Sequence, residues 1–486
     1  MIFDLVVIGS GPAGQKAALQ GAKAGKKVAI IEEYKAVGGG CVHFGTLPSK
    51  SFRESVYRWS LGSRGTLGSE GEHHPTGGRA RDPLPDMKRL LRRCERVVRG
   101  EEQVISHQLK RNHVKIYHGR ARIISANEVE VKSRKGTERL SADFIFIATG
   151  ARPVSPPHLK VDGKVVHDSN TILTLKKLPK NIVVLGAGII GAEYGSMFSI
   201  AGTKVLLVDR RHEILAAVDR EIVDHLVDRF VAHGMEVLLE VEAKKIDRVT
   251  SGKSPHVKIE LSNGRKIKAD LVLVTLGRHG NSEDLGLEEV GVERDERGLI
   301  QVDSNFRTTI PNIYAVGDVV GPPALASTSM EQGRFACCHA FKIEEYGKNT
   351  APADRVKLFP YGIYTIPEIS MVGPTEEELI HQKADFVVGR AHYRELARGQ
   401  IVGDHWGLLK LLVDSRTFKI LGVHIVGDNA AELAHIGQAV MALGGDVHYF
   451  IRNVFNYPTL AEAYKTAAFH AVNQIRERDK AFKPVK

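Results

Sequence analysis

Short apolar segments separated by glycine turns recur along this chain and predict buried strands. Residues 3–8 read FDLVVI, an apolar, β-branched run typical of a strand buried on both faces. Residues 12–25 (PAGQKAALQGAKAG) have helical character and end in glycine, and the apolar segment KVAII follows. The order strand, helix, strand predicts an α/β unit.

A glycine motif joins the first strand to the first helix. Gly9, Gly11 and Gly14 have the spacing G-x-G-x-x-G, and Glu32 follows the second strand 18 residues after Gly14. Glycines let the backbone approach a pyrophosphate, the helix N-terminus supplies N–H donors, and the acid accepts hydrogen bonds from a ribose. The glycines alone would fit a turn without a ligand, but the full order favours a dinucleotide site.

The same order of strand, glycine motif, helix, strand and acid occurs a second time. The segment NIVVLGAGIIGAEYGSMF supplies a strand and then Gly186, Gly188 and Gly191. The next strand, KVLLV, ends at Asp209, again 18 residues after the last glycine. Two such units in one chain predict two α/β domains and two bound dinucleotides.

Length, charge and cysteine content narrow the class of protein. The 486 residues suggest two to four domains, and the net charge of +11 suits nucleic acid, a membrane surface or small polyanions such as dinucleotides. Four cysteines are too few for a disulfide framework, which favours a reducing cytoplasm. The N-terminus lacks a basic region before its apolar run, and no uncharged apolar run reaches about 18 residues. Neither a signal peptide nor a membrane-spanning helix is expected.

Two further strand-and-glycine segments make a family resemblance plain. FIFIATGARP (144–153) runs into Thr149 and Gly150, and TTIPNIYAVGDVV (308–320) carries Gly317 and Asp318. With the two glycine motifs, the chain resembles the FAD- and NAD(P)-dependent pyridine nucleotide–disulfide oxidoreductases, which include lipoamide dehydrogenase and glutathione reductase. The resemblance covers nearly the whole chain except residues 62–86, which read as an insertion or surface loop.

The resemblance implies an α/β fold with two Rossmann-like dinucleotide-binding domains and a C-terminal α+β dimerisation domain. Residues 1–150 and 271–342 would form the FAD-binding domain, 151–270 the NAD(P)-binding domain, and 343–486 the interface domain of a homodimer or higher homo-oligomer. In the family the first glycine motif and the later aspartate hold FAD, and the second motif holds the nicotinamide nucleotide. The expected cofactor-binding residues are Gly9, Gly11, Gly14, Glu32, Glu33, Gly40, Cys41, Thr46, Lys50, Thr149, Gly150, Gly317, Asp318, Gly186, Gly188, Gly191, Asp209, Arg210, Arg211 and Gly277.

The stretch GGGCVHFGTLPSK (38–50) departs from the family pattern of two cysteines spaced C-x4-C. Cys41 holds the first position, but Thr46 holds the second, and a threonine hydroxyl cannot form a disulfide. The family also uses a histidine, in H-P-x-x-x-E, as the base for the exchanging thiol. Here Tyr457 stands at that position, and a phenol with a pKa near 10 is a poor base at neutral pH. Cys41 is therefore expected to line the cofactor pocket, with a reactive thiol as the alternative.

The residues that serve the flavin are retained. Lys50 matches the family lysine near the flavin N5, and Glu193 matches its ion-pair partner; these are the expected catalytic residues, against the alternative of ordinary surface charges. Hydride can then enter from a nicotinamide, but no disulfide can carry it out. The expected activity is a ping-pong, FAD-dependent transfer from NADPH to NAD⁺ (NAD⁺ + NADPH = NADH + NADP⁺), with both nucleotides as substrates.

The second dinucleotide site carries both kinds of specificity residue. Asp209 can bond a ribose 2′-hydroxyl, and Arg210 and Arg211 can pair with a 2′-phosphate. Their juxtaposition favours use of both NAD(H) and NADP(H), although arginines that are merely solvated would give the same sequence.

Other functions stay open at this point. An NAD(P)H:quinone reductase or diaphorase would also lack the dithiol, and a non-catalytic flavoprotein would act as a redox sensor. The basic segment 87–100 would suit nucleic acid or a membrane, but it lacks interleaved aromatic residues and fits a solvated helix face better. On this basis no nucleic acid or membrane partner is expected. The histidines and cysteines have no metal-ligand spacing, so no metal site is expected.

Overall fold

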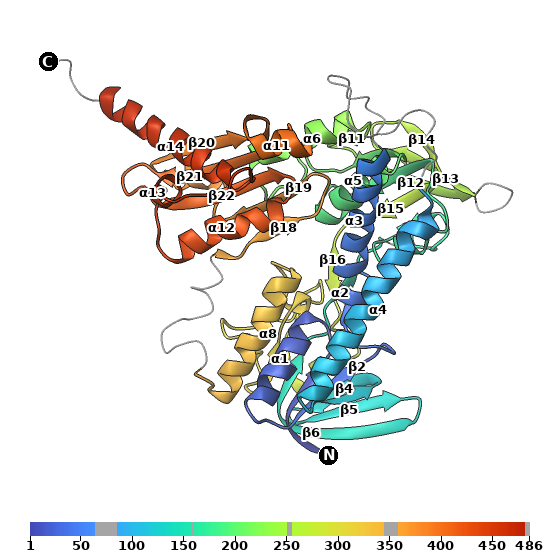
Figure 1. Ribbon diagram of the computed structural model, residues 1–486. Coiled ribbons are helices and arrows are strands. Elements are labelled where there is room, and N and C mark those ends of the chain that lie inside the picture. The colour runs from blue at the N-terminus through green and yellow to red at the C-terminus, as the bar shows by residue number, and fades with distance from the viewer. Residues whose placement is uncertain (64–84, 157–158, 250–254, 345–357, 482–486) are drawn as a thin grey trace. The chain divides into compact units, whose positions relative to one another are not determined.

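The computed structural model describes residues 1–486 except 64–84, 157–158, 250–254, 345–357 and 482–486 (Figure 1). Most of the expected insertion at 62–86 therefore lies outside the described residues. The chain divides into two compact units, each assembled from separate stretches. Unit 1 comprises Met1–Ser55, Asp86–Lys177 and Leu273–Val356, and unit 2 comprises Val56–Pro85, Leu178–Val272 and Lys357–Lys486. The expected three-domain division stays a prediction.

A seven-stranded sheet forms the centre of unit 1, with the order β3-β2-β1-β6-β5-β4 and β17 paired to β6. The strands β1, β2, β3, β6 and β17 pair in parallel, and β4 and β5 add antiparallel pairs. The bounds are β1 Ile2–Ile8, β2 Val28–Glu32, β3 Lys115–His118, β4 Arg120–Ser125, β5 Glu128–Ser133, β6 Gly136–Ile147 and β17 Ile313–Ala315.

Strand β1 is buried on both faces, as its sequence predicts. Leu5 and Val7 belong to one apolar cluster, whereas Val6 and Ile8 belong to another. Side chains alternate across a strand, so the two clusters lie on opposite faces of the sheet. Both faces of this strand therefore need a covering layer.

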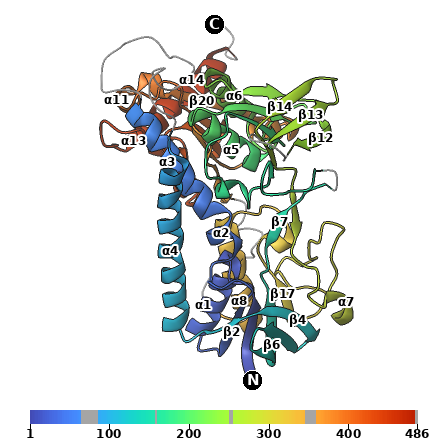
Figure 2. The ribbon, with the colours of Figure 1, turned by 90° about the vertical axis from the view of Figure 1, so that its right-hand side faces the viewer.

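Helices α1 (Pro12–Lys23) and α8 (Ala326–Phe341) lie side by side in unit 1 (Figures 1 and 2). A Cβ on Gly333 would stand only 2.1 Å from the Ala13 carbonyl oxygen, so glycine permits this close approach. Cys337 and Cys338 are buried in α8, where they pack as small apolar residues. The remaining elements of the unit are α2 Gly39–His43, the first part of α3 Thr46–Ser63, α4 Met87–Arg111, β7 Ala151–Pro153, β8 Val166–His167, β16 Arg278–Gly280 and α7 Leu287–Val290.

The second glycine motif starts a parallel arrangement in unit 2. Strand β10 (Lys204–Val208) pairs in parallel with β9 (Asn181–Leu185) and with β11 (Glu236–Leu238). Helix α5 (Ile189–Ile200) joins β9 to β10, and α6 (Arg220–Ala232) joins β10 to β11. Three antiparallel strands follow, β12 Ala243–Val249, β13 His256–Leu261 and β14 Lys266–Ala269, and then β15 Leu271–Val274.

The C-terminal part of unit 2 is an antiparallel sheet in the order β18-β19-β22-β21-β20, covered by helices. Helix α14 (Glu462–Ala481) packs on β20 at Gly389, where a Cβ would lie 2.1 Å from the Ala467 carbonyl oxygen. The buried Tyr464 hydroxyl donates to the Leu433 carbonyl oxygen of α12 over 2.7 Å. The other bounds are β18 Tyr361–Ile363, β19 Glu368–Val372, α10 Glu376–His381, β20 Phe386–His392, α11 Ala397–Val402, β21 Leu408–Asp414, β22 Ile420–Gly427, α12 Ala430–Ala442 and α13 His448–Arg452.

The basic segment 87–100 lies within helix α4. Asp86 caps this helix by accepting from the Lys88 backbone N–H, and Leu90 and Cys94 face the interior while the arginines are outside. None of the helices among the described residues has both the length and the apolar character needed to cross a membrane.

Candidate dinucleotide and redox sites

The three glycines of the first motif have different structural roles. A Cβ on Gly9 would lie 2.3 Å from the Ala148 carbonyl oxygen, and one on Gly14 would lie 2.0 Å from the Gly9 carbonyl oxygen. Gly9 also has φ +103°, which a side chain would disfavour. In contrast, a Cβ on Gly11, the residue before α1, would meet nothing within 4 Å. The first and third glycines are thus needed for packing, and the second leaves open space at the helix N-terminus.

Glu32 stands at the end of β2, where its carboxylate is buried and hydrogen-bonded. It accepts from the Ser10 backbone N–H (3.1 Å), from the Ser10 hydroxyl, and from the Tyr34 N–H (3.0 Å). The Ser10 hydroxyl in turn accepts from the Gly38 N–H over 2.8 Å, which ties the glycine loop to the stretch around Cys41. Sequence reasoning missed Ser10, since it occupies a variable position of the motif. Glu33, the next residue along, is exposed.

A second group of expected cofactor-binding residues lies just after β6 and β17 in the same unit, and Gly277 lies just before β16. The Thr149 Oγ1 is buried and has no hydrogen-bond partner among the described residues, so it is available to a ligand. Gly150, Gly277 and Gly317 all have positive φ, at +71°, +128° and +83°. Asp318 follows Gly317 directly, and its Oδ2 lies 3.8 Å from the Arg278 Nη2.

The open loop at Gly11, the buried acid Glu32 and the unpaired hydroxyl of Thr149 fit FAD. The pyrophosphate of a dinucleotide would meet the loop at Gly11, and a ribose diol would meet Glu32. Polar ring or chain atoms would meet Thr149. All three features belong to unit 1.

Cys41 lies in the short helix α2, and Thr46 begins α3. Burial raises the pKa of the Cys41 thiol; a hydrogen bond with the Thr46 side chain opposes the rise, and the pKa stays above its ordinary value. A thiol with a raised pKa is protonated at neutral pH, which disfavours the reactive-thiol interpretation. All four cysteines of the sequence lie in the described residues, and none of them forms a disulfide there.

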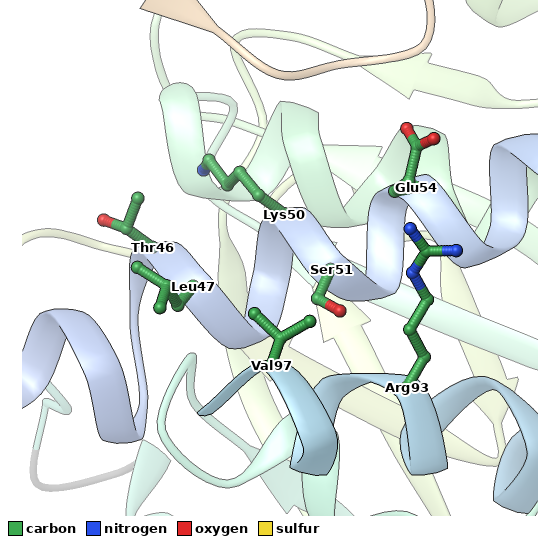
Figure 3. A pocket seen from close by; sticks show the side chains of 7 residues that line it. All are labelled: Thr46, Leu47, Lys50, Ser51, Glu54, Arg93 and Val97. Atoms are coloured by element: carbon green, nitrogen blue, oxygen red, sulfur yellow. The ribbon is translucent and has the colours of Figure 1, made fainter. Parts of the chain in front are cut away.

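A cavity of about 230 Å³ adjoins Thr46 and Lys50 (Figure 3). Thr46, Lys50 and Glu54 follow one another at four-residue intervals on α3, so they share one face of that helix. The other lining residues are Leu47 and Ser51 of α3 and Arg93 and Val97 of α4. Lys50 therefore borders a small, partly apolar hollow in unit 1.

Glu193, the expected partner of Lys50, belongs to unit 2. It is buried in α5, and its Oε1 accepts from the Tyr364 N–H over 2.9 Å. The ion pair with Lys50 stays a prediction. Tyr457, at the position of the family base, is largely exposed.

The second glycine loop is hydrogen-bonded to the acid that follows the next strand, as the first loop is. Gly186 has φ +106°, Gly188 precedes α5, and Gly191 is buried in the first turn of that helix. The buried Asp209 carboxylate accepts from the Ala187 N–H (2.6 Å), the Arg211 N–H (2.8 Å), the Arg211 Nε (3.0 Å) and the Arg211 Nη2 (2.7 Å).

Asp209 and Arg211 each stabilise the charged form of the other. Burial raises the pKa of Asp209, but the hydrogen bonds and charge of Arg211 outweigh burial and hold that pKa below its ordinary value. The neighbouring Arg210 is exposed, and in the part of the chain that the structure describes its side chain has no hydrogen bond or ion pair.

Two nucleotide-type βαβ units, a buried acid after each and a cysteine beside the first define a class of FAD- and pyridine-nucleotide-dependent enzyme. The sequence model of the pyridine nucleotide-disulphide oxidoreductases matches residues 3–333, and that of their dimerisation domain matches 359–468. The chain belongs to the pyridine nucleotide-disulphide oxidoreductase family. The predicted fold class is thereby confirmed.

Two relatives resemble the chain over nearly its whole length. The soluble pyridine nucleotide transhydrogenase of Mycobacterium bovis (strain BCG / Pasteur 1173P2) is 45% identical over 98% of both chains. The protein of the same name from Yersinia pestis (strain Pestoides F) is 42% identical over 97% of this chain and 98% of its own.

Solved structures agree with the fold. LpdA from Mycobacterium tuberculosis superposes with a TM-score of 0.85 at 26% identity, covering 96% of this chain and 99% of its own. The Cu(II) complex of the HOCl-induced flavoprotein disulfide reductase RclA from Escherichia coli gives 0.84 at 28% identity, with the same coverage of 96% and 99%.

Proposed function

We propose that this protein is an FAD-dependent transhydrogenase that moves hydride from NADPH to NAD⁺ without a redox-active disulfide. The relatives named soluble pyridine nucleotide transhydrogenase, at 45% and 42% identity, support the activity. The observation that carries the disulfide-free part is the pairing of Cys41 with Thr46, a hydrogen-bonded thiol and hydroxyl where the family has two sulfurs. The reaction balances as NADPH + NAD⁺ = NADP⁺ + NADH.

The FAD would be held by unit 1. The open N-terminus of α1 at Gly11 would receive the pyrophosphate, Glu32 the ribose of the adenosine, and Asp318 the ribityl chain. When bound, the flavin would supply a ring able to take up hydride from one nicotinamide and pass it to another. Lys50 and Glu193 are proposed to act beside it, because a cation near that ring stabilises the charge it gains.

The nicotinamide nucleotides would use the second glycine loop in turn. Gly188 opens α5 toward a pyrophosphate, and Asp209, Arg210 and Arg211 meet the ribose that carries either a 2′-hydroxyl or a 2′-phosphate. This assignment retains the proposed domains, with 1–150 and 271–342 for FAD, 151–270 for NAD(P) and 343–486 for the interface.

The lack of a dithiol and of its histidine base supports a nicotinamide nucleotide as the acceptor of hydride. Thr46 cannot exchange with a disulfide substrate, and Tyr457 replaces the histidine that would activate a thiol. A small nucleotide that takes hydride directly needs neither group.

The proposed assembly is a homodimer in the cytoplasm. The match of residues 359–468 to the family's dimerisation domain supports the dimer. Four cysteines that form no disulfide among the described residues suit a reducing compartment, which supports the location.

The test is an anaerobic assay with purified, FAD-loaded protein. NADPH and thio-NAD⁺ are mixed with the protein while the thionicotinamide absorbance is followed, and a parallel cell offers NADH and lipoamide. Rapid thio-NAD⁺ reduction without lipoamide turnover is expected. Bleaching of the flavin with thio-NAD⁺ left oxidised would contradict the proposal and direct the search to quinones.

A further inference from the structure

The two dinucleotide loops differ in the acceptor capacity that their acids leave for a ribose. An ionised carboxylate has about four lone-pair sites for hydrogen-bond donors. Glu32 receives three donors, the Ser10 N–H, the Ser10 hydroxyl and the Tyr34 N–H, so one site stays open. Asp209 receives four, one from Ala187 and three from Arg211, so its capacity is full.

The two acids have equivalent backbone donors and differ in their side-chain donors, which are the Ser10 hydroxyl for Glu32 and the Arg211 guanidinium for Asp209. Ser10 and Ala187 each follow the first glycine of their motif, and each donates its backbone N–H to the acid. Tyr34 and Arg211 each stand two residues after the acid and donate their backbone N–H to it. Only the Arg211 guanidinium, which has no counterpart at Tyr34, fills the remaining sites of Asp209.

The Arg211 guanidinium also lies over the glycine loop itself. The Cβ position of Gly188 is 3.9 Å from the Arg211 Nη2, whereas that of Gly11 has nothing within 4 Å. Gly188 is the glycine at which the pyrophosphate of a dinucleotide is expected to approach the protein backbone. The side chain therefore stands at the entrance of the second loop, where it is 44% exposed to solvent.

We propose that Arg211 determines nucleotide specificity by occupying two positions. In the first it blocks Asp209, so an NAD(H) ribose gains its hydrogen bond to the acid only when the guanidinium withdraws. In the second position it pairs with the 2′-phosphate of NADP(H). This planar, charge-assisted contact compensates for the hydrogen bonds to Asp209 that the guanidinium loses. Arg211 thus favours NADP(H) and opposes NAD(H). This inference rests on the proposed function for the identity of the ligands.

The test uses nucleotide fragments that cannot carry hydride. ADP-ribose and 2′-phospho-ADP-ribose are titrated calorimetrically into the FAD-loaded wild type, Arg211→Ala and Arg265→Ala. Arg265→Ala is a matched control in the same unit, because Arg265 pairs with the Glu236 carboxylate through two nitrogens on the surface.

Arg211→Ala is expected to bind ADP-ribose roughly tenfold more tightly, equivalent to about 1.4 kcal/mol, and 2′-phospho-ADP-ribose at least about tenfold more weakly. Arg265→Ala is expected to bind both as the wild type does. If Arg211→Ala binds ADP-ribose with equal or lower affinity, or binds the phosphorylated fragment unchanged, the two-position role is overturned.

A second variant guards against a folding defect in Arg211→Ala. In Arg211→Lys the ammonium keeps the charge but cannot span both carboxylate oxygens, so both affinities should move in the same directions by smaller factors. Affinities equal to the wild type in this variant would also overturn the proposal. Fragment binding needs no hydride transfer, so the reciprocal shift can hold while the thio-NAD⁺ assay fails, and the reverse.

Discussion

Lys410 places its ammonium nitrogen 2.8 and 2.9 Å from the two carboxylate oxygens of Asp219, and both side chains are essentially fully buried. The same nitrogen lies 3.0 Å from Glu221 and 2.6 Å from Glu376, so one lysine on β21 joins two acids at the start of α6 to a third at the start of α10. Arg390 adds two hydrogen bonds to Glu221, at 2.7 and 3.0 Å. Because a buried charge is costly without its partners, this network is a sensitive point of the unit.

Lys410→Met should destabilise the protein by about 3–5 kcal/mol, since it leaves Asp219 buried and uncompensated. Urea unfolding followed by circular dichroism measures the change, with Lys258→Met, at an exposed position of β13, as the control. A loss for Lys410→Met no larger than for the control would mean that the network adds nothing to stability.

The same network predicts an acid-sensitive component of stability. Burial raises the pKa of Glu221, but hydrogen bonds from Arg390 and Lys410 outweigh burial and lower it from 4.5 to about 2. A pKa that is lower in the folded state makes the ionised form stabilising above pH 4.5, and this contribution is lost as the pH falls toward 2.

Urea midpoints of the wild type and Glu221→Gln should therefore converge between pH 6 and pH 3, with Glu242→Gln, at an exposed site, parallel to the wild type. A constant gap between the wild type and Glu221→Gln across this range would show that Glu221 does not titrate as its surroundings require.

Two alanine substitutions in the first glycine motif should separate packing from cofactor binding. Gly14→Ala places a Cβ against the Gly9 carbonyl oxygen at 2.0 Å and should cost about 1–3 kcal/mol or more of folding stability. Gly11→Ala meets no atom within 4 Å, so the apoprotein should unfold as the wild type does while FAD affinity falls. Apoprotein unfolding and FAD titration test this, and equal destabilisation by both substitutions would refute the division of roles.

Thr46→Cys should restore electron storage outside the flavin. The Cys41 and Thr46 side chains are already in hydrogen-bond contact, so a second sulfur would stand close to the first. Formation of a disulfide would add two electrons to the uptake, giving four per FAD on anaerobic dithionite titration against two for the wild type and for Thr46→Ser. Two electrons per FAD in Thr46→Cys would indicate that the sulfurs do not meet.

Much of the fold could be predicted from the sequence, because local patterns specify it. The apolar runs at 3–8 and 181–185 became β1 and β9, and each glycine motif leads into a helix as its spacing requires. These features depend on residues that are near one another in the chain.

Features that depend on distant residues could not be predicted in this way. Lys410 forms ion pairs with the acids at positions 219, 221 and 376. The hydrophobic periodicity of the sequence does not predict these pairs. Asp209 and Arg211 were visible as candidates, but the filling of the carboxylate by one guanidinium is a matter of side-chain geometry. The Ser10 bridge between Glu32 and Gly38 is hidden for the same reason.

Hydride transfer without a disulfide is tested most directly by a single-turnover experiment under anaerobic conditions. Protein is treated with one equivalent of NADPH per FAD, freed of NADP⁺, and mixed with NAD⁺ while flavin absorbance, NADH and free thiols are measured. We expect that the flavin bleaches fully with one equivalent, recovers on mixing, and yields one NADH per FAD with the thiol titre constant. A flavin that needs two equivalents, or that stays reduced in the presence of NAD⁺, would contradict hydride transfer without a disulfide.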